Sequence, residues 1–163
     1  MNSSRIDHPF GPLFSEHSRV LILGSFPSVK SREQNFFYGH PQNRFWKVIA
    51  ALYGQKIPGT IPEKRQLILE NGLALWDSIA SCEITGSSDT SIRNVRANDL
   101  RVILDHSPIE RIYCNGQKSF EMYRKYILNT IGREAACLPS TSPANAQFSL
   151  ERLIEAWSVL KGK

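Results

Sequence analysis

The stretch VLILGSFPSVKSREQNFFYGHPQNRFW, residues 20–46, decides how the chain is organised. Its first four residues are apolar without alternation, a pattern typical of a strand that is buried on both faces of a parallel sheet. The sequence Gly-Ser-Phe-Pro at residues 24–27 then forces a turn. Because open parallel sheets bind ligands at the carboxyl ends of their strands, we expect this turn to form one wall of a binding site. Aromatic and amide side chains come next in the stretch, and such side chains can bind a ligand with a flat polar ring.

Length and composition predict one ordinary globular domain covering residues 1–163, with an irregular N-terminal segment over residues 1–18. Hydrophobic residues make up 41% of the chain and charged residues 21%, which is typical of a water-soluble protein. The 20 Lys and Arg residues against 15 Asp and Glu give a formal charge of +5. This excess fits an ordinary basic surface as well as it fits attraction to a phosphate-bearing partner.

The sequence indicates neither a membrane segment nor a metal site. Residues 1–19 are polar and do not resemble a signal peptide, and the longest apolar run, residues 48–53, is far too short to span a membrane. Cys82, Cys114 and Cys137 lie far apart, which fits reduced thiols and gives no metal-ligand spacing. We therefore expect a protein of the cytoplasm or nucleoid, of bacterial type, with no metal and no cofactor.

Short apolar runs alternate with helical periodicity along the chain, which predicts an α/β fold. Strands are expected at residues 20–23, 73–76, 111–114 and 135–138. Helices are expected at residues 43–53, 60–71, 100–104, 120–127 and 150–160. The polar residues 77–99 are expected to form a long irregular loop. This order predicts a single three-layer α/β/α domain with a central, mainly parallel four-stranded sheet.

Three polar turns follow predicted strands. They lie at residues 24–28, at Asn115-Gly116 and at residues 140–145. Because the carboxyl ends of parallel strands meet at one edge of a sheet, we expect these separate segments to line one cleft.

The predicted cleft offers amides, hydroxyls and aromatic rings rather than a familiar catalytic motif. No Gly-x-Ser-x-Gly elbow, Walker loop or dinucleotide fingerprint is present. Asn43 and Asn115 each carry a donor and an acceptor, the pair needed to read the edge of a nucleobase. Tyr38 can stack on a base, and the hydroxyls of residues 140–142 can hold phosphates. Each residue also has a structural interpretation: Asn43 can cap a helix, Asn115 can be an ordinary turn residue, and His40 can fix a loop.

Four motifs lie in the same order as in a known enzyme family. They are Tyr-Gly-His-Pro-Gln-Asn-Arg-Phe-Trp at residues 38–46, Asn-Gly at 115–116, Leu-Pro-Ser-Thr-Ser-Pro-Ala-Asn at 138–145 and Ser-Leu-Glu-Arg-Leu-Ile-Glu-Ala at 149–156. Over residues 20–160 the chain resembles the uracil-DNA glycosylase superfamily, and closely its mismatch-specific uracil and thymine branch. In that branch the aromatic residue of the first motif stacks on the flipped base, and the third motif presses into the minor groove.

The turn after the first strand departs from that branch. Mismatch-specific enzymes have Gly-Ile-Asn-Pro-Gly there and use the asparagine to position the attacking water, whereas this chain has Phe26 at that place. A further subgroup, the hypoxanthine (deoxyinosine) DNA glycosylases called family six, has a Gly-Ser-Phe-Pro type of turn and resembles this chain better. Its important asparagine is the one in His-Pro-x-Asn, which corresponds to Asn43. Residues 76–89 also resemble this subgroup.

The resemblance implies a monofunctional DNA glycosylase whose expected substrate is the deaminated base hypoxanthine. Such an enzyme flips the base out of DNA and hydrolyses its N-glycosidic bond during base excision repair. It implies that Asn43 is the catalytic residue and that the protein is a monomer whose partner is DNA containing a damaged base. The implied base-binding residues are Phe26, Tyr38, His40 and Asn115. The implied DNA-binding residues are Ser140, Thr141, Ser142, Ala144 and Asn145. Two further candidates for pocket carboxylates are Asp77 and Asp89.

Three alternatives stay open from the sequence. The first is a uracil or mismatched-thymine glycosylase on the same fold. The second is a non-catalytic DNA-binding member, because the asparagine of the first turn is replaced by Phe26. The third is an enzyme that acts on a small molecule and has no affinity for DNA.

Overall fold

The computed structural model describes residues 4–85 and 92–162, which contain two β-sheets. The larger sheet has the strand order β3-β2-β6-β7 and is parallel throughout. Its strands are β2 (Val20–Gly24), β3 (Leu73–Asp77), β6 (Arg111–Asn115) and β7 (Ala136–Leu138). The predicted α/β fold around a four-stranded parallel sheet is therefore confirmed.

Strand β2 is the centre of this sheet. In its register Leu21 lies opposite Ala74 of β3 on one side and Ile112 of β6 on the other. All residues of β2 and β3 are buried. The uninterrupted apolar run that opens the 20–46 stretch follows from this position, because a central parallel strand has both faces covered.

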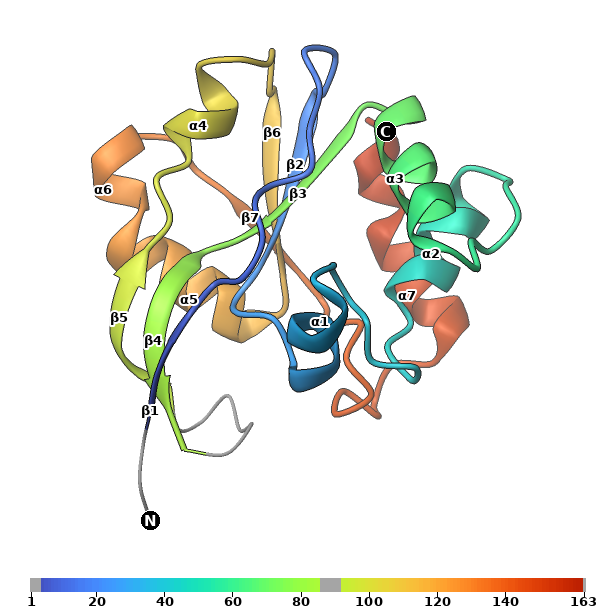
Figure 1. Cartoon of the computed structure of the whole chain (residues 1–163). Helices are drawn as coiled ribbons and strands as arrows, with labels where there is room; N and C mark the ends of the chain where they lie inside the picture. Colours follow the sequence, from blue (N-terminus) through green and yellow to red (C-terminus); the bar gives the residue numbers. More distant parts are fainter. Residues whose placement is uncertain (1–3, 86–91, 163) are drawn as a thin grey trace.

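Helices cover both faces of the parallel sheet (Figure 1). One face carries α2 (Phe45–Leu52), α3 (Ile61–Glu70) and α7 (Leu150–Trp157), which continues into the 3-10 turn η2 (Ser158–Lys161). The other face carries α4 (Arg101–Leu104), α5 (Gln117–Tyr126) and α6 (Leu128–Ile131). The short helix α1 (Val29–Gln34) lies at the carboxyl edge of the sheet, near the loop that follows β7. None of the helices in the described residues has the length and apolar character needed to cross a membrane.

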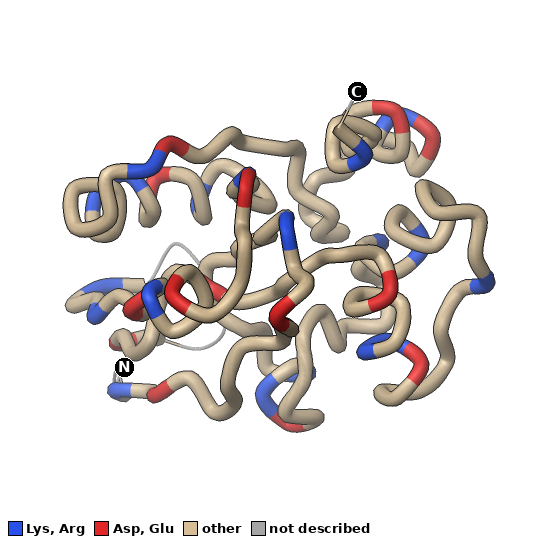
Figure 2. The backbone as a smooth tube through the Cα atoms, turned by 90° about the horizontal axis from the view of Figure 1, so that it is seen from above, with Lys and Arg blue, Asp and Glu red and all other residues tan. Residues whose placement is uncertain are grey.

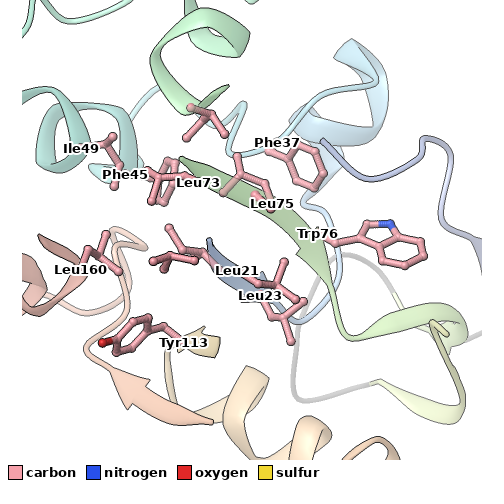
Figure 3. Packing of buried hydrophobic residues seen from close by; sticks show 14 of the residues in the cluster. Leu21, Leu23, Phe37, Phe45, Ile49, Leu73, Leu75, Trp76, Tyr113 and Leu160 are labelled. Atoms are coloured by element: carbon pink, nitrogen blue, oxygen red, sulfur yellow. The ribbon is translucent and has the colours of Figure 1, made fainter. Parts of the chain in front are cut away.

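The main core lies between the parallel sheet and the helices of the first face. Leu21 and Leu73 lie close to Phe45 and Ile49 of α2 in Figure 3, and all four side chains are fully buried. Phe45 also meets the ring of Trp157 edge-on, with 5.9 Å between the ring centroids. This packing fixes the amino end of α2, and with it the Asn43-Arg44 pair that precedes the helix.

The helix termini follow the capping residues in the sequence. Thr60 and Glu63 form a complete capping box at the start of α3, and the Ser149 hydroxyl accepts a hydrogen bond from the backbone N–H of Arg152 in α7. Helix α2 begins at Phe45, two residues later than expected. The Asn43 side chain nevertheless caps it, since its Oδ1 accepts a hydrogen bond from the Phe45 N–H at 2.9 Å.

A second sheet, with the order β1-β4-β5, corrects two predictions. Residues 77–99 are not one irregular loop, because β4 (Ile79–Ile84) and β5 (Arg93–Ala97) pair antiparallel within them. The N-terminal segment is not wholly irregular either, because β1 (Ser4–Asp7) pairs antiparallel with β4. Strands β1 and β5 lie at the edges of the sheet and carry exposed polar side chains. Their sequences therefore lack the apolar periodicity by which a strand is predicted. Helix α1 was also missed: it is six residues long and is capped by Ser28.

The central position of β2 predicts a large effect of shortening Ile22, which is fully buried. Ile22→Ala should lower the free energy of unfolding by about 2–5 kcal/mol, because it removes buried methyl groups and leaves a cavity. Urea denaturation measures this change. The matched control is Ile57→Ala, whose side chain is 51% exposed and which should stay within about 0.5 kcal/mol of the parent. Equal losses in the two variants would contradict the assignment of β2 to the core.

Candidate active site

A cavity of about 460 Å³ lies at the carboxyl edge of the parallel sheet. It brings together the three turns that the sequence analysis placed there: residues 24–28, Asn115 and residues 140–142. Residues from the 37–43 segment, from helix α1 and from the ends of β3 and β4 complete the wall. The expectation of one cleft shared by distant segments therefore agrees with the structure.

Most of the predicted site residues line this cavity. They are Phe26, Tyr38, Asn43, Asn115, Ser140, Thr141, Ser142 and Ala144. Two do not. His40 turns its ring toward its own loop, where Nδ1 accepts the Gln42 N–H at 3.1 Å, and Asn145 donates from Nδ2 to the Ser140 carbonyl at 3.0 Å. These two side chains shape the loops on either side of the cavity.

The hydroxyl of Thr141, which is fully buried, joins the two predicted amides. It donates to Asn43 Oδ1 at 2.8 Å and accepts from Asn115 Nδ2 at 3.0 Å. Asn115 Oδ1 in turn accepts the backbone N–H of Thr141 at 3.0 Å. The side chains of the second and third motifs are thus locked to that of the first before any ligand is present.

This network decides what Asn43 can offer. Its Oδ1 receives two hydrogen bonds, from Thr141 and from the Phe45 N–H, which fill the two lone pairs of an amide oxygen. Its Nδ2 has no partner among the described residues. Asn43 therefore presents hydrogen-bond donors to the cavity and no free acceptor. Asn115 retains one N–H and one lone pair beyond its contacts with Thr141.

Arg44 anchors the loop that follows β7, a role that sequence reasoning missed. Its backbone N–H donates to the Thr141 carbonyl, and its Nη2 donates to the carbonyls of Ser142 and Asn145, each at 2.9 Å. Its Nη1 donates to the carbonyl of Phe148. A guanidinium group carries five N–H donors in a rigid fork, so one side chain can hold several carbonyls. The adjacent position of Arg44 and Asn43 in the motif is the signal that could have revealed this role.

Tyr38 lies on the cavity wall with its ring stacked on Phe45, at 4.1 Å between ring centroids and 22° between planes. Its backbone has φ = 52°, a left-handed conformation that is uncommon for a bulky residue and is often found at functional sites. The Oη atom is buried without a hydrogen-bond partner. Burial, reinforced by the Asp77 carboxylate, raises the pKa of the phenol well above its usual range, and the Asn115 amide, near but outside hydrogen-bond geometry, opposes this.

Phe26 contributes a turn and an apolar wall rather than a polar group. Its side chain is 8% exposed and packs in a small cluster with Ile79, Cys82 and Ile84. The guanidinium of Arg32 lies 5.7 Å from its ring centroid. The turn itself is tied to the start of β4, because the Ser25 carbonyl accepts the Ile79 N–H.

Asp77, at the end of β3, places a carboxylate in the cavity wall. Its Oδ2 lies 2.7 Å from Nε2 of His8, and both side chains are almost completely buried. Sequence reasoning named Asp77 as a candidate but missed His8, because His8 belongs to the segment that was expected to be irregular. Asp89, the other candidate, lies outside the described residues.

Charged residues of both signs are spread along the chain. Lys and Arg alternate with Asp and Glu around the tube in Figure 2. Among the described residues no group of three or more His, Cys, Asp or Glu side chains is arranged to hold a metal ion. The site therefore offers amides, hydroxyls, aromatic rings, the Arg32 guanidinium and the Asp77 carboxylate as its chemical groups.

The Thr141 hydroxyl makes hydrogen bonds to both Asn43 and Asn115. We therefore expect its removal to lower the free energy of unfolding by more than the loss of a single hydrogen bond does. Thr141→Val keeps the shape of the side chain but leaves Asn43 and Asn115 each without one partner, so the free energy of unfolding should fall by about 1–3 kcal/mol. The matched control is Thr130→Val, which removes a single bond to the Ile127 carbonyl and should cost less. Urea unfolding of both variants measures the difference, and the idea is wrong if Thr141→Val is as stable as the parent.

Comparisons with known proteins identify a family and named relatives. The model of the uracil DNA glycosylase superfamily matches residues 12–161. A protein of Methanosarcina acetivorans named hypoxanthine DNA glycosylase is 33% identical over 158 residues, covering 96% of this chain and 99% of the relative. A protein of the same name from Methanosarcina barkeri is 31% identical over 151 residues, covering 91% of this chain and 94% of the relative.

A solved structure resembles the fold over almost its full length. It is the solution NMR structure of a Methanosarcina acetivorans protein described as a candidate uracil DNA glycosylase. The two structures superpose with a TM-score of 0.77 at 30% identity, covering 93% of this chain and 96% of the other. The resemblance inferred from the four motifs is therefore confirmed, and the chain belongs to the uracil DNA glycosylase superfamily.

Proposed function

We propose that this protein is a monofunctional DNA glycosylase that excises hypoxanthine from DNA. The observation that carries the proposal is the position of Asn43, whose free amide N–H groups lie in the cavity wall with the Tyr38 ring and the 140–142 loop. Two relatives that are named hypoxanthine DNA glycosylase, at 31% and 33% identity, support this substrate. The whole chain would act as one glycosylase domain, as a monomer, on DNA in the cytoplasm.

Base flipping would bring the damaged nucleotide into the cavity. A mispaired base costs less to unstack than a correctly paired one, which favours the extrusion of a deaminated purine. Tyr38 supplies an aromatic ring for stacking, and the backbone around Phe26 forms the floor. The remaining N–H and lone pair of Asn115 can bond the edge of the base. Residues Ser140, Thr141, Ser142, Ala144 and Asn145 form the loop that would grip the strand.

The bond to the sugar would break dissociatively, leaving an oxocarbenium-like sugar and a departing base anion. Such a reaction needs a placed water and hydrogen-bond donors rather than a strong protein nucleophile. Asn43 fits this need as a rigid donor, because its Oδ1 is already held by two hydrogen bonds. Its N–H groups would hold the oxygen of the attacking water or of the deoxyribose.

A panel of duplexes tests the proposed substrate. Each carries one of uracil, thymine mispaired with guanine, hypoxanthine or xanthine, and alkaline cleavage of the abasic product reports excision. Hypoxanthine should be released fastest. Faster release of uracil or thymine would identify a mismatch enzyme instead. Salt-sensitive DNA binding without any abasic product would identify a non-catalytic binder, and a lack of DNA affinity would exclude a role in DNA.

Variants of Asn43 separate catalysis from helix capping. Asn43→Ala should lose most hypoxanthine excision and also about 1 kcal/mol of stability, because the cap of α2 disappears. Asn43→Asp keeps an oxygen that can accept both hydrogen bonds, so it should fold like the parent and still lose excision, because the free N–H donors are gone. Single-turnover rates and thermal unfolding measure the two effects. Normal excision by Asn43→Asp would contradict the catalytic role and would show that Asn43 only caps the helix.

A further inference from the structure

We propose that Asp77, held in place by His8, is the group that distinguishes hypoxanthine from adenine. Its free carboxylate oxygen accepts the ring N–H that deamination creates, which is N1–H in hypoxanthine. This inference rests on the proposed function and names the recognition element of the same cavity.

The contact with His8 fixes one side of the carboxylate. The Phe10 N–H donates to His8 Nδ1 at 3.4 Å, so the ring proton lies on Nε2 and is donated to Asp77 Oδ2 at 2.7 Å. The side chains of His8 and Asp77 are 4% and 6% exposed. The His8 ring packs edge-on against Phe10 and Phe26, with 4.5 and 5.9 Å between ring centroids. His8 is therefore a positioning residue that bonds one oxygen and leaves the other free.

The free oxygen, Oδ1, lies against Gly24. A Cβ atom at position 24 would come within 2.3 Å of it, so the carboxylate reaches this place only because residue 24 is glycine. The same Cβ atom would lie 3.4 Å from the Tyr38 hydroxyl oxygen, which has no hydrogen-bond partner among the described residues. The backbone of Asp77 is held by the sheet, where it pairs opposite Gly24, and its carbonyl accepts the Asn98 amide N–H. Oδ1 itself has no hydrogen-bond partner among the described residues.

Asp77 also supplies a negatively charged acceptor to the cavity. Among the described residues it is the only carboxylate on the cavity wall. Asn43 has no free lone pair on its amide oxygen, and Asn115 has one left. A buried carboxylate with one oxygen bonded and the other bare is costly unless the bare oxygen meets a donor, which points to a ligand N–H.

The chemistry of deamination matches this acceptor. In adenine N1 carries a lone pair, whereas in hypoxanthine N1 carries a hydrogen and C6 carries an oxygen. A carboxylate accepts hydrogen bonds and cannot donate them, so it attracts N1–H and repels the N1 lone pair. A site built to bond a polar group of its substrate strongly rejects an analogue in which that group is missing. Asp77 would thus protect adenine from excision while it admits hypoxanthine.

Base analogues test this in the unaltered protein. Identical duplexes carry hypoxanthine or 1-methylhypoxanthine, in which a methyl group replaces the N1 hydrogen, and single-turnover excision is followed for both. Hypoxanthine should be released at least about tenfold faster. Equal rates would overturn the inference while the proposed function stands. Failure to release hypoxanthine at all would overturn both, so the two failures are distinguishable.

Asp77→Asn then identifies the residue. His8 still donates to the oxygen at the Oδ2 position, so the new amide turns its NH₂ group to the cavity and opposes N1–H. Hypoxanthine excision should fall at least about tenfold, whereas excision of nebularine, a purine whose N1 carries a lone pair, should be unchanged or faster. Equal slowing of both bases would show that Asp77 acts on water or sugar and would overturn base recognition.

A second substitution tests the part of His8. His8→Phe fits the surrounding aromatic rings and removes the donor, so in the Asp77→Asn background the amide is free to turn its oxygen to the cavity. The double variant should regain part of the preference for hypoxanthine over nebularine that the single variant loses. A merely structural role of His8 predicts a further loss instead, and that result would overturn the assignment of His8 as the positioning residue.

Discussion

The hydroxyl of Thr141 connects three segments that are far apart in the sequence, and the site depends on this connection. It bonds Asn43, which precedes α2, and Asn115, which ends β6, while its own backbone belongs to the loop after β7. A buried hydroxyl with both of its roles satisfied leaves little freedom to the groups that it joins. Arg44 then holds the remainder of that loop through its carbonyls. The cavity wall is therefore organised before any ligand binds.

Saturation of Asn43 Oδ1 also resolves the two interpretations of that residue. The oxygen caps α2 and receives the Thr141 hydroxyl, whereas the NH₂ group faces the cavity. The amide oxygen of Asn43 caps the helix and its NH₂ group is the donor to the cavity. Because the hydrogen bonds of the oxygen fix the plane of the amide, they also orient the NH₂ group. An asparagine serves both purposes where an aspartate would offer no donor. The replacement of a polar residue by Phe26 in the first turn is consistent with this arrangement, since that turn provides an apolar wall.

Much of the fold was predictable because its signals are local. The four parallel strands are short apolar runs, and the capping residues Thr60 and Ser149 lie where α3 and α7 begin. Strands β1 and β5 were missed because their edge positions leave polar side chains exposed, so their pairing depends on β4 rather than on their own pattern. Most of the proposed site residues were also found from the sequence, because the turns after parallel strands must meet at one edge.

The sequence by itself determined the parallel sheet, the shared edge of its turns and the Asn43 motif, since these follow from periodicity and residue type. Only the tertiary structure decided the hydrogen-bonding state of each group. In the folded chain the oxygen of Asn43 accepts hydrogen bonds from Thr141 and from the Phe45 N–H. The His40 ring bonds within its own loop, and His8 bonds Asp77, which lies 69 residues away in the sequence. Which donor meets which acceptor depends on distances of a few tenths of an ångström between distant segments, and no local pattern encodes them.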